Sequence, residues 1–116
     1  MSRDHGLYLR DILAAGAKIR SVTDSHFFQE FTEEWMARDA VARNFELIGE
    51  AVRRLPKELL AQAPEVEWEK FLALRKILLH AYFQLDDEIL WDAAMAKLPG
   101  LLAAAERLLR ALGGAQ

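Results

Sequence analysis

Hydrophobic residues recur every three or four positions along most of the chain, a spacing that places side chains on one face of an α-helix. In the first such segment the apolar positions are Tyr8, Ile12, Ala15 and Ile19. The residues from Ser21 to Ser25 then offer turn and capping side chains. We therefore predict a first helix over residues 3–20 that ends in a turn.

Two more helices are predicted in the next part of the chain. Phe27, Phe31 and Trp35 repeat every four positions and indicate a short second helix. The clearest repeat follows, at Val41, Phe45, Ile48, Val52 and Leu55. Pro56 has no amide hydrogen and interrupts helices, so a third helix is predicted over residues 36–55.

The second half of the chain has the same helical spacing. Residues 56–64 are predicted to hold one short turn, which Pro64 closes. A long helix is predicted over residues 68–83, with apolar positions at Phe71, Leu74 and Leu78. Asp86 is expected to cap the last helix, which should kink at Pro99. No stretch of useful length alternates with period two, so we predict an all-α antiparallel bundle of about five helices.

Composition and charge limit the class of protein. The chain has 116 residues, 53% of them hydrophobic, which is enough for one core; we predict a single domain over residues 1–112 and a flexible tail over 113–116. The absence of cysteine excludes disulfides, thiolate metal sites and a cysteine nucleophile. The formal net charge of −3 argues against a protein that coats long nucleic acid, so any RNA contact needs a local basic patch.

Targeting signals and several catalytic motifs are missing from the sequence. The N-terminus has no leader pattern and no apolar run reaches membrane-spanning length, so a cytoplasmic protein without a membrane partner is expected. The sequence also lacks a phosphate-binding glycine loop, a zinc-binding His-Glu-x-x-His helix and a Gly-x-Ser-x-Gly nucleophile turn. The three histidines have no ligand-like spacing, so we expect no metal site and no cofactor.

The segment over residues 68–83 carries the candidate chemistry. On a continuous helix Arg75 and Tyr82 share a face, whereas Arg75 and His80 lie about 140° apart. Spacing alone favours an ordinary role for both residues, because a histidine near the end of an amphipathic helix is commonly a surface residue or a core residue with its hydrogen bonds satisfied, and Tyr82 would be an ordinary interface aromatic. For Arg75 and His80 to form one site, the Arg side chain has to bend round or a second copy has to complete the site, and this favours a homodimer.

The order Arg75, four residues, His80, one residue, Tyr82 resembles the Arg-x4-His-x-Tyr signature of HepT-like toxins in the HEPN superfamily. The resemblance covers nearly the whole chain, in ordered blocks over residues 8–13, 40–51 and 68–91. It implies a HEPN-like helical homodimer that cleaves RNA without a metal, through attack of the 2′-hydroxyl on the adjacent phosphate. In that reaction His80 matches the acid/base and Arg75 the phosphate clamp.

The sequence departs from the family pattern at the position after the arginine. A small polar residue such as Asn is usual there, whereas this chain has Lys76, a cation suited to a place beside the phosphate. On the polar side of the third predicted helix, most residues are expected to form ordinary solvated ion pairs. Arg43, Asn44 and Glu50 are candidates for binding substrate or supporting His80. Gly49 is expected to allow close approach of another helix or chain.

The resemblance also implies a partner. HepT-like toxins are typically encoded beside a minimal nucleotidyltransferase, MntA, which silences the toxin by attaching AMP to the signature tyrosine, here Tyr82. Two other readings remain open. One is an inactive HEPN-type dimer that serves as a docking subunit for the transferase, and the other is a plain helical oligomerisation domain.

Overall fold

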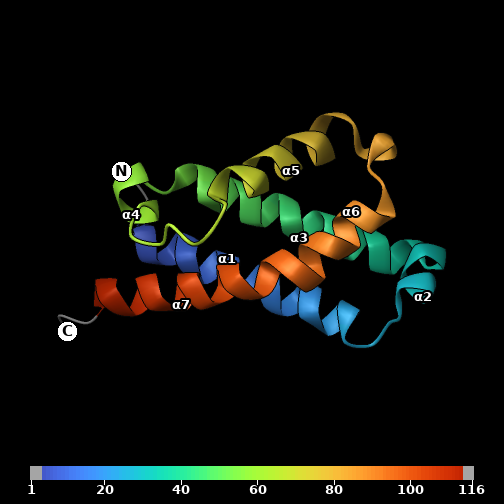
Figure 1. The fold of residues 1–116 in the computed structure, drawn as a ribbon, viewed down its shortest axis with the longest axis horizontal. Coiled ribbons are helices and arrows are strands. Elements are labelled where there is room, and N and C mark those ends of the chain that lie inside the picture. The colour runs from blue at the N-terminus through green and yellow to red at the C-terminus, as the bar shows by residue number, and fades with distance from the viewer. Residues whose placement is uncertain (1–3, 114–116) are drawn as a thin grey trace.

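The computed structural model describes residues 4–113, and over these residues all of its regular secondary structure is helical. The elements are α1 (His5–Thr23), α2 (Phe28–Glu33), α3 (Trp35–Arg54), α4 (Lys57–Leu60), α5 (Trp68–His80), the 3₁₀ turn η1 (Tyr82–Gln84), α6 (Asp87–Asp92), the π-helical segment η2 (Ala93–Lys97) and α7 (Leu98–Gly113). Because α6, η2 and α7 follow one another without a break, the described residues form six helical rods (Figure 1). The all-α prediction is confirmed.

The rods pack as an antiparallel bundle in which α3 lies between α1 and α5 (Figure 1). Along the α1–α7 contact, Gly6 approaches Leu109 and Gly16 approaches Leu102, so the two helices run in opposite directions. The predicted apolar face of α3 is confirmed, because Val41, Phe45, Ile48, Val52 and Leu55 are all buried. Each such side chain contributes about 1.5–3 kcal/mol when it leaves water.

The end of α1 differs from the prediction. The helix continues to Thr23 through residues that were predicted to form a turn. Its last carbonyl groups find partners beyond the helix, since the Asp24 amide donates to the carbonyl of Arg20 at 2.8 Å and the Ser25 hydroxyl lies 3.0 Å from that of Val22. The capping side chains therefore act after Thr23, not within residues 21–23.

The predicted short second helix is confirmed as α2, but of the repeat Phe27, Phe31 and Trp35 that indicated it, only Phe31 lies within the helix. Only Phe31 is buried, whereas Phe27 and Trp35 are 81% and 69% exposed. Phe27 precedes α2 as its N-cap residue. The chain leaves the helical conformation at Glu34, so Trp35 begins α3 and does not extend α2. The spacing of four therefore spans two helices that point in different directions.

The long helix predicted over residues 68–83 is also shorter than expected. It starts at Trp68, whose indole N–H donates to the carbonyl groups of Leu60 and Ala63, both at 3.1 Å. It ends at His80, because Ala81 leaves the helical region with φ −145° and ψ 39°. Tyr82 therefore lies in η1, outside the helix that carries Arg75.

The last rod begins as predicted. The Asp86 side chain accepts from the Glu88 amide at 3.2 Å and caps α6. A kink was expected at Pro99. The rod continues through Pro99 in α7, and the π-helical segment η2 ends two residues before it, where the Leu98 amide donates to the carbonyl of Ala93. Residues 114–116 of the predicted tail lie outside the described residues, and α7 includes Gly113. Within residues 4–113, no helix has both the length and the apolar character to cross a membrane.

Candidate active site

The close approach of α3 and α5 fixes where Arg75 starts. A Cβ atom at Gly49 would lie 2.4 Å from the Cβ of Arg75 and 3.0 Å from the carbonyl oxygen of Phe71. Real Cβ atoms do not tolerate such contacts, so only glycine allows α5 to lie this close to α3. The prediction that Gly49 permits close helix approach is confirmed.

From this contact the Arg75 side chain reaches Glu50 on α3. Its Nη2 atom lies 2.9 Å from Oε2 of Glu50. The same carboxylate accepts from Arg53 at 3.1 and 3.2 Å and from Arg54 at 3.0 Å. We call these four residues the Glu50 cluster. The hydrogen bonds from Arg53, with Arg54 and the charge of Arg75, hold the pKa of Glu50 at about 2 against the opposing effect of partial burial.

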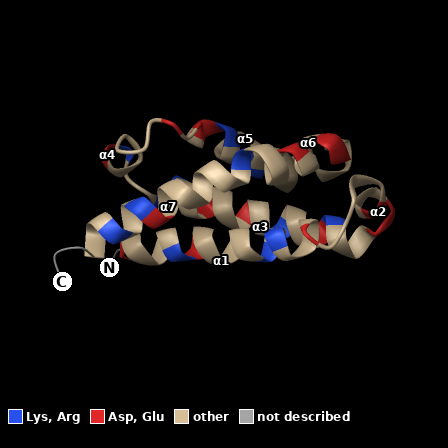
Figure 2. Ribbon diagram, turned by 60° about the horizontal axis from the view of Figure 1, so that its bottom comes forward, with Lys and Arg blue, Asp and Glu red and all other residues tan. Residues whose placement is uncertain are grey.

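The Glu50 cluster is a local basic patch on a chain of negative net charge. Three guanidinium groups surround one carboxylate, which leaves two net positive charges at the cluster. The Arg75 side chain keeps 25% of its surface exposed. Figure 2 shows further basic positions along α5 and an acidic start of α6. The cluster is thus suited to receive an anionic phosphate.

His80 is exposed at the last residue of α5. Within residues 4–113 its side chain makes no hydrogen bond or ion pair. The helix carries it about 7.5 Å along the axis from Arg75 and about 140° around it. Arg75 turns to α3, and no hydrogen bond or ion pair joins it to His80 among the described residues. Lys76 is exposed on α5 beside Arg75 and likewise has no polar partner among the described residues.

Tyr82 occupies a different position from the one predicted, because it lies beyond the end of α5. Its hydroxyl donates to the Asp39 carboxylate on α3, and the guanidinium carbon of Arg38 lies 4.7 Å from its ring centroid. Arg38 also pairs with Asp87 and donates to the carbonyl of Leu85 at 2.9 Å. Partial burial, together with the hydrogen bond to Asp39, raises the pKa of Tyr82.

Tyr82 and Arg75 nevertheless reach the same face of α3. Their partners, Asp39 and Glu50, are eleven residues apart, which is about 20° around the helix and about 16 Å along it. Arg75 and Tyr82 were predicted to share a face of one helix. In the structure they instead contact the same face of a neighbouring helix, α3. The Tyr82 hydroxyl and the Arg75 guanidinium meet that face about three helical turns apart.

The other two support candidates on α3 do not contact Arg75 or His80. Arg43 is exposed and pairs with Glu46 at 3.2 Å. Asn44 is buried toward α1, where its Nδ2 donates to the carbonyl of Ala40 at 2.8 Å and its Oδ1 has no partner among the described residues. It borders a hollow of about 410 Å³ between α1 and α3.

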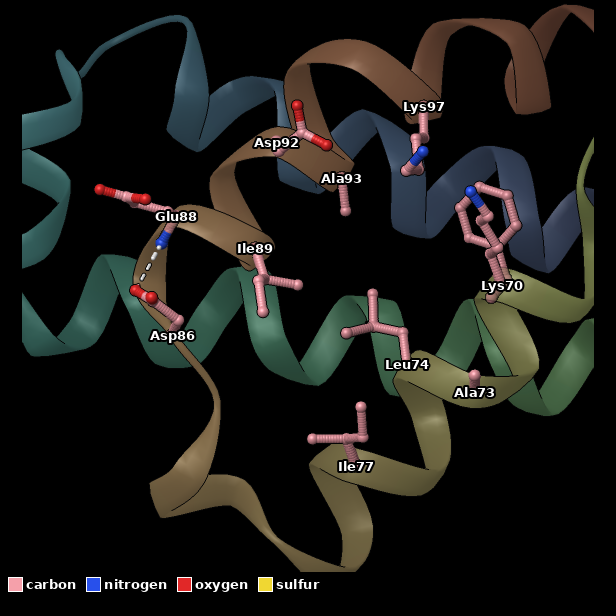
Figure 3. Close-up of a pocket in the computed structure, with 11 residues that line it drawn as sticks. Lys70, Ala73, Leu74, Ile77, Asp86, Glu88, Ile89, Asp92, Ala93 and Lys97 are labelled. Carbon is pink, nitrogen blue, oxygen red and sulfur yellow. Dashed lines mark hydrogen bonds between the residues drawn. The ribbon is translucent and has the colours of Figure 1, made fainter.

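A larger hollow, of about 660 Å³, lies between α5 and α6. In Figure 3 its lining has apolar side chains such as Leu74, Ile77 and Ile89, with Lys70 and Lys97 at one end and acidic residues at the other. None of the candidate site residues lines it. Within residues 4–113, no three His, Asp or Glu side chains are arranged to hold a metal ion.

Sequence reasoning missed the residues that hold Tyr82, namely Arg38, Asp39 and Asp87. It also treated Arg53 and Arg54 as ordinary surface charges, although both bind Glu50. The sequence did contain a signal for Asp39, because this residue shares a helical face with Glu50 in the predicted third helix. The contacts to Arg38 join residues 47 and 49 positions apart and leave no local pattern.

Comparison with known proteins identifies a matching family. The model of the family described as "Ribonuclease HepT-like" matches residues 12–108. A Methanocaldococcus jannaschii protein provisionally named an RNase is 34% identical over 97% of this chain and 93% of its own length. A Thermococcus cleftensis protein provisionally named ribonuclease HepT is 34% identical over 93% of this chain and 98% of its own length.

A second protein of M. jannaschii with the provisional name RNase is 35% identical over 84% of this chain and 89% of its own length. The search of solved structures gave no match. The family model spans most of the chain, including Glu50, Arg75, His80 and Tyr82, and the relatives align over nearly their full length. The chain therefore belongs to the HepT-like ribonuclease family.

Proposed function

We propose that this protein is an RNA-cleaving toxin that acts as a homodimer without a metal ion. One observation carries the proposal: Arg75 is fixed in a cluster with two net positive charges, and an exposed His80 lies little more than one turn further along the same helix. The names of the relatives support the ribonuclease activity at the level of the family.

The reaction uses groups that this chain supplies. His80 takes the proton of the RNA 2′-hydroxyl, whose oxygen then attacks the adjacent phosphorus. Arg75 donates to the phosphate oxygens as negative charge develops on them. The bond to the 5′-oxygen breaks, and that oxygen is protonated by a second acid. The products are a 2′,3′-cyclic phosphate and a 5′-hydroxyl end.

A second copy of the chain completes the site. This part of the proposal is supported by the ion pair that turns Arg75 to Glu50 on α3, while His80 is exposed at the end of α5. A dimer joins Arg75 of one protomer to His80 of the other. If both His80 rings enter one cleft, one acts as base and the other as acid.

We further propose that an MntA-like minimal nucleotidyltransferase silences the toxin by transferring AMP to Tyr82. The Tyr82 hydroxyl reaches the face of α3 on which Arg75 binds Glu50. An adenylyl group there adds bulk and a negative phosphate to the face that RNA approaches. The modification then blocks the approach of RNA without any change in the fold of the toxin.

The test combines growth with cleavage in vitro. Expression of the wild type is expected to arrest growth, and His80→Ala is expected to relieve it, with His5→Ala as a matched control on another exposed histidine. Purified wild type is expected to cleave single-stranded RNA in excess chelator. Cleavage that stops with chelator and returns with a divalent ion would contradict the metal-free mechanism. Cleavage that survives His80→Ala would contradict the role of His80.

A second function has some support. Arg75 already has an ion-pair partner in Glu50, and Lys76 replaces the small polar residue that usually follows this arginine. Both features suit an inactive dimer that docks the nucleotidyltransferase. This alternative predicts tight binding of the transferase with no cleavage by the free dimer, and the cleavage assay above decides between the two.

A further inference from the structure

We infer that Asp39 is the proton acceptor for Tyr82 during AMP transfer, so that this chain supplies the base for its own modification. This inference rests on the proposed silencing of the toxin at Tyr82. The observation behind it is a phenol and a carboxylate that are already hydrogen bonded across 43 residues of sequence.

The surroundings of Tyr82 explain why a base is needed. The pKa of the phenol is raised, first by partial burial and then by the hydrogen bond to Asp39. The resting hydroxyl is therefore neutral near pH 7, and a neutral phenol is a weak nucleophile. Its proton must leave as the new bond forms. The Asp39 carboxylate already accepts that proton in a hydrogen bond.

The step balances without any group beyond ATP. The Tyr82 oxygen attacks the α-phosphorus of ATP, an O–P bond forms, and the bond between the α-phosphorus and the bridging oxygen breaks. Pyrophosphate leaves with that electron pair, and the phenolic proton passes to Asp39. Asp39 is exposed, so the proton can pass on to solvent.

Arg38 acts as a positioning residue in this arrangement. Its guanidinium covers the Tyr82 ring at 4.7 Å, and its contacts with Asp87 and the Leu85 carbonyl fix it against the start of α6. The ring is thereby held in η1 with its hydroxyl toward α3. The charged groups that face the phenol are Asp39 and Arg38 of α3 and, behind Arg38, Asp87 of α6.

The experiment measures single-turnover transfer of label from [α-³²P]ATP, in the presence of Mg²⁺, to the full-length chain by an MntA-like minimal nucleotidyltransferase. Asp39→Asn keeps an oxygen that accepts from the hydroxyl but cannot take the proton. We expect it to lower the transfer rate by about 100-fold or more, the typical effect of losing a general base. Tyr82→Phe should take no label, and mass spectrometry should locate the wild-type label on Tyr82.

The pH profile separates a base from a structural support. In wild type the rate should be nearly flat between pH 6 and 9. In Asp39→Asn it should rise about tenfold per pH unit, because the phenol must then ionise on its own. Asp87→Asn loosens Arg38 without touching the hydroxyl, so we expect a lower transfer rate with a pH profile that stays flat.

The outcomes separate this inference from the proposed silencing. Transfer to Asp39→Asn at the wild-type rate, or with a flat profile, would overturn the role of Asp39 alone. A wild type that takes no label on Tyr82 would overturn the proposed modification and the role of Asp39 with it. Circular dichroism of each variant checks that the helical fold is intact.

Discussion

Glu50 determines how Arg75 presents its charge. In an exposed arginine the side chain samples many rotamers, and ordering it on a phosphate costs conformational entropy. The 2.9 Å pair with Glu50 limits that freedom before RNA arrives, while Arg53 and Arg54 keep the cluster positive. Glu50 therefore positions Arg75 without cancelling the attraction for phosphate.

Glu50→Gln tests this role. The variant keeps the shape of the side chain but loses the charge that orders Arg75, so we expect RNA cleavage to fall about tenfold or more. Thermal stability should change by less than about 1 kcal/mol, because the pairs are substantially exposed. Glu46→Gln, which breaks only the pair with Arg43, is the control. Unchanged cleavage in Glu50→Gln would show that Arg75 needs no support.

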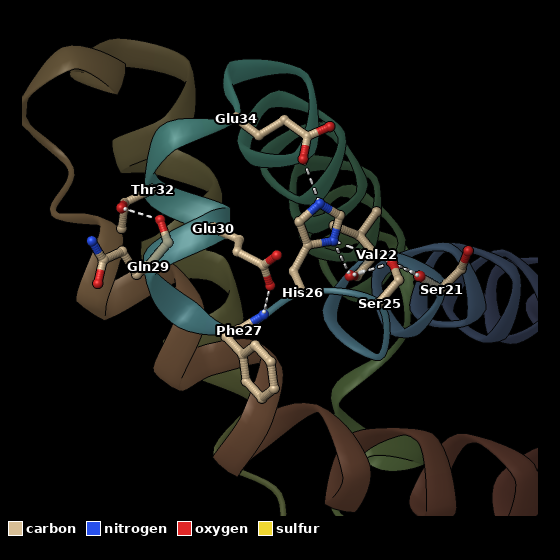
Figure 4. Close-up of polar contacts among 9 residues, drawn as sticks. All are labelled: Ser21, Val22, Ser25, His26, Phe27, Gln29, Glu30, Thr32 and Glu34. Atoms are coloured by element: carbon tan, nitrogen blue, oxygen red, sulfur yellow. Dashed lines mark hydrogen bonds and ion pairs between the residues drawn. The ribbon is translucent and has the colours of Figure 1, made fainter.

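At the scale of elements, His26 links the end of α1 to the start of α3. Its Nδ1 lies 2.7 Å from the carbonyl oxygen of Val22 and its Nε2 lies 2.6 Å from Oε2 of Glu34 (Figure 4). Both ring nitrogens thus face oxygen acceptors, which suits the protonated ring. The hydrogen bond to Glu34, and next that to Val22, raises the pKa of His26. The hydroxyl oxygen of Ser25 also lies 3.2 Å from Nδ1. Because Nδ1 donates its proton to the carbonyl oxygen of Val22, it cannot act as a base for this hydroxyl.

The raised pKa of His26 predicts a pH-dependent stability. The folded pKa lies above the ordinary value of 6.5, so the stabilising contribution is complete below pH 6.5 and is lost as the pH rises through the folded pKa. We expect the Tm of wild type to fall over this interval more than that of His26→Gln. Glu34→Gln should flatten the profile in the same way. Equal pH dependence in wild type and both variants would contradict the link.

The contact between α3 and α5 gives a prediction about Gly49. Gly49→Ala places a methyl group 2.4 Å from the Cβ of Arg75, so α5 has to move and the protein should lose about 1–3 kcal/mol of stability. Gly100→Ala on α7 meets nothing within 4 Å and should gain up to about 1 kcal/mol. Chemical denaturation measures both. Equal stability of the two variants would refute the close packing at Gly49.

The sequence was sufficient for the helices whose apolar spacing stays within one element. The face of α3 from Val41 to Leu55 and the inward positions of α5 at Phe71, Leu74 and Leu78 were all predicted and are buried. The errors arise where distant contacts override local spacing. Arg38 binds the Leu85 carbonyl and Asp87 from 47 and 49 residues away, just beyond the point where the chain leaves the α5 helix at Ala81.

The candidate site was predictable to a similar extent. Arg75 and His80 were identified and their divergence on one helix follows from spacing alone. The residues of α3 that contact Arg75 and Tyr82 are determined by the way α5 crosses α3. No local sequence pattern predicts that crossing. Glu50 was named as a support residue without its ion pairs, and Asp39 was not named, because pairing between helices is a property of the tertiary fold.

At the scale of the whole molecule, the placement of Arg75 and His80 makes a site shared by two protomers the central expectation. Light scattering at micromolar concentration should show a dimer, and a strict monomer would remove the shared site. A sharper test mixes Arg75→Ala with His80→Ala, each inactive alone. A heterodimer then has one shared site with both residues intact and one with neither.

Random exchange makes about half of the dimers mixed, so cleavage should return to about a quarter of the wild-type rate. Exchange is verified by capture of an untagged variant on a tagged one. If each chain instead joined its own Arg75 to its own His80, a mixed dimer would hold no intact site and mixing would restore nothing. A site that requires both His80 rings in one cleft would also fail to recover. Recovery of cleavage in the mixed dimer therefore favours a site built from Arg75 of one protomer and a single His80 of the other.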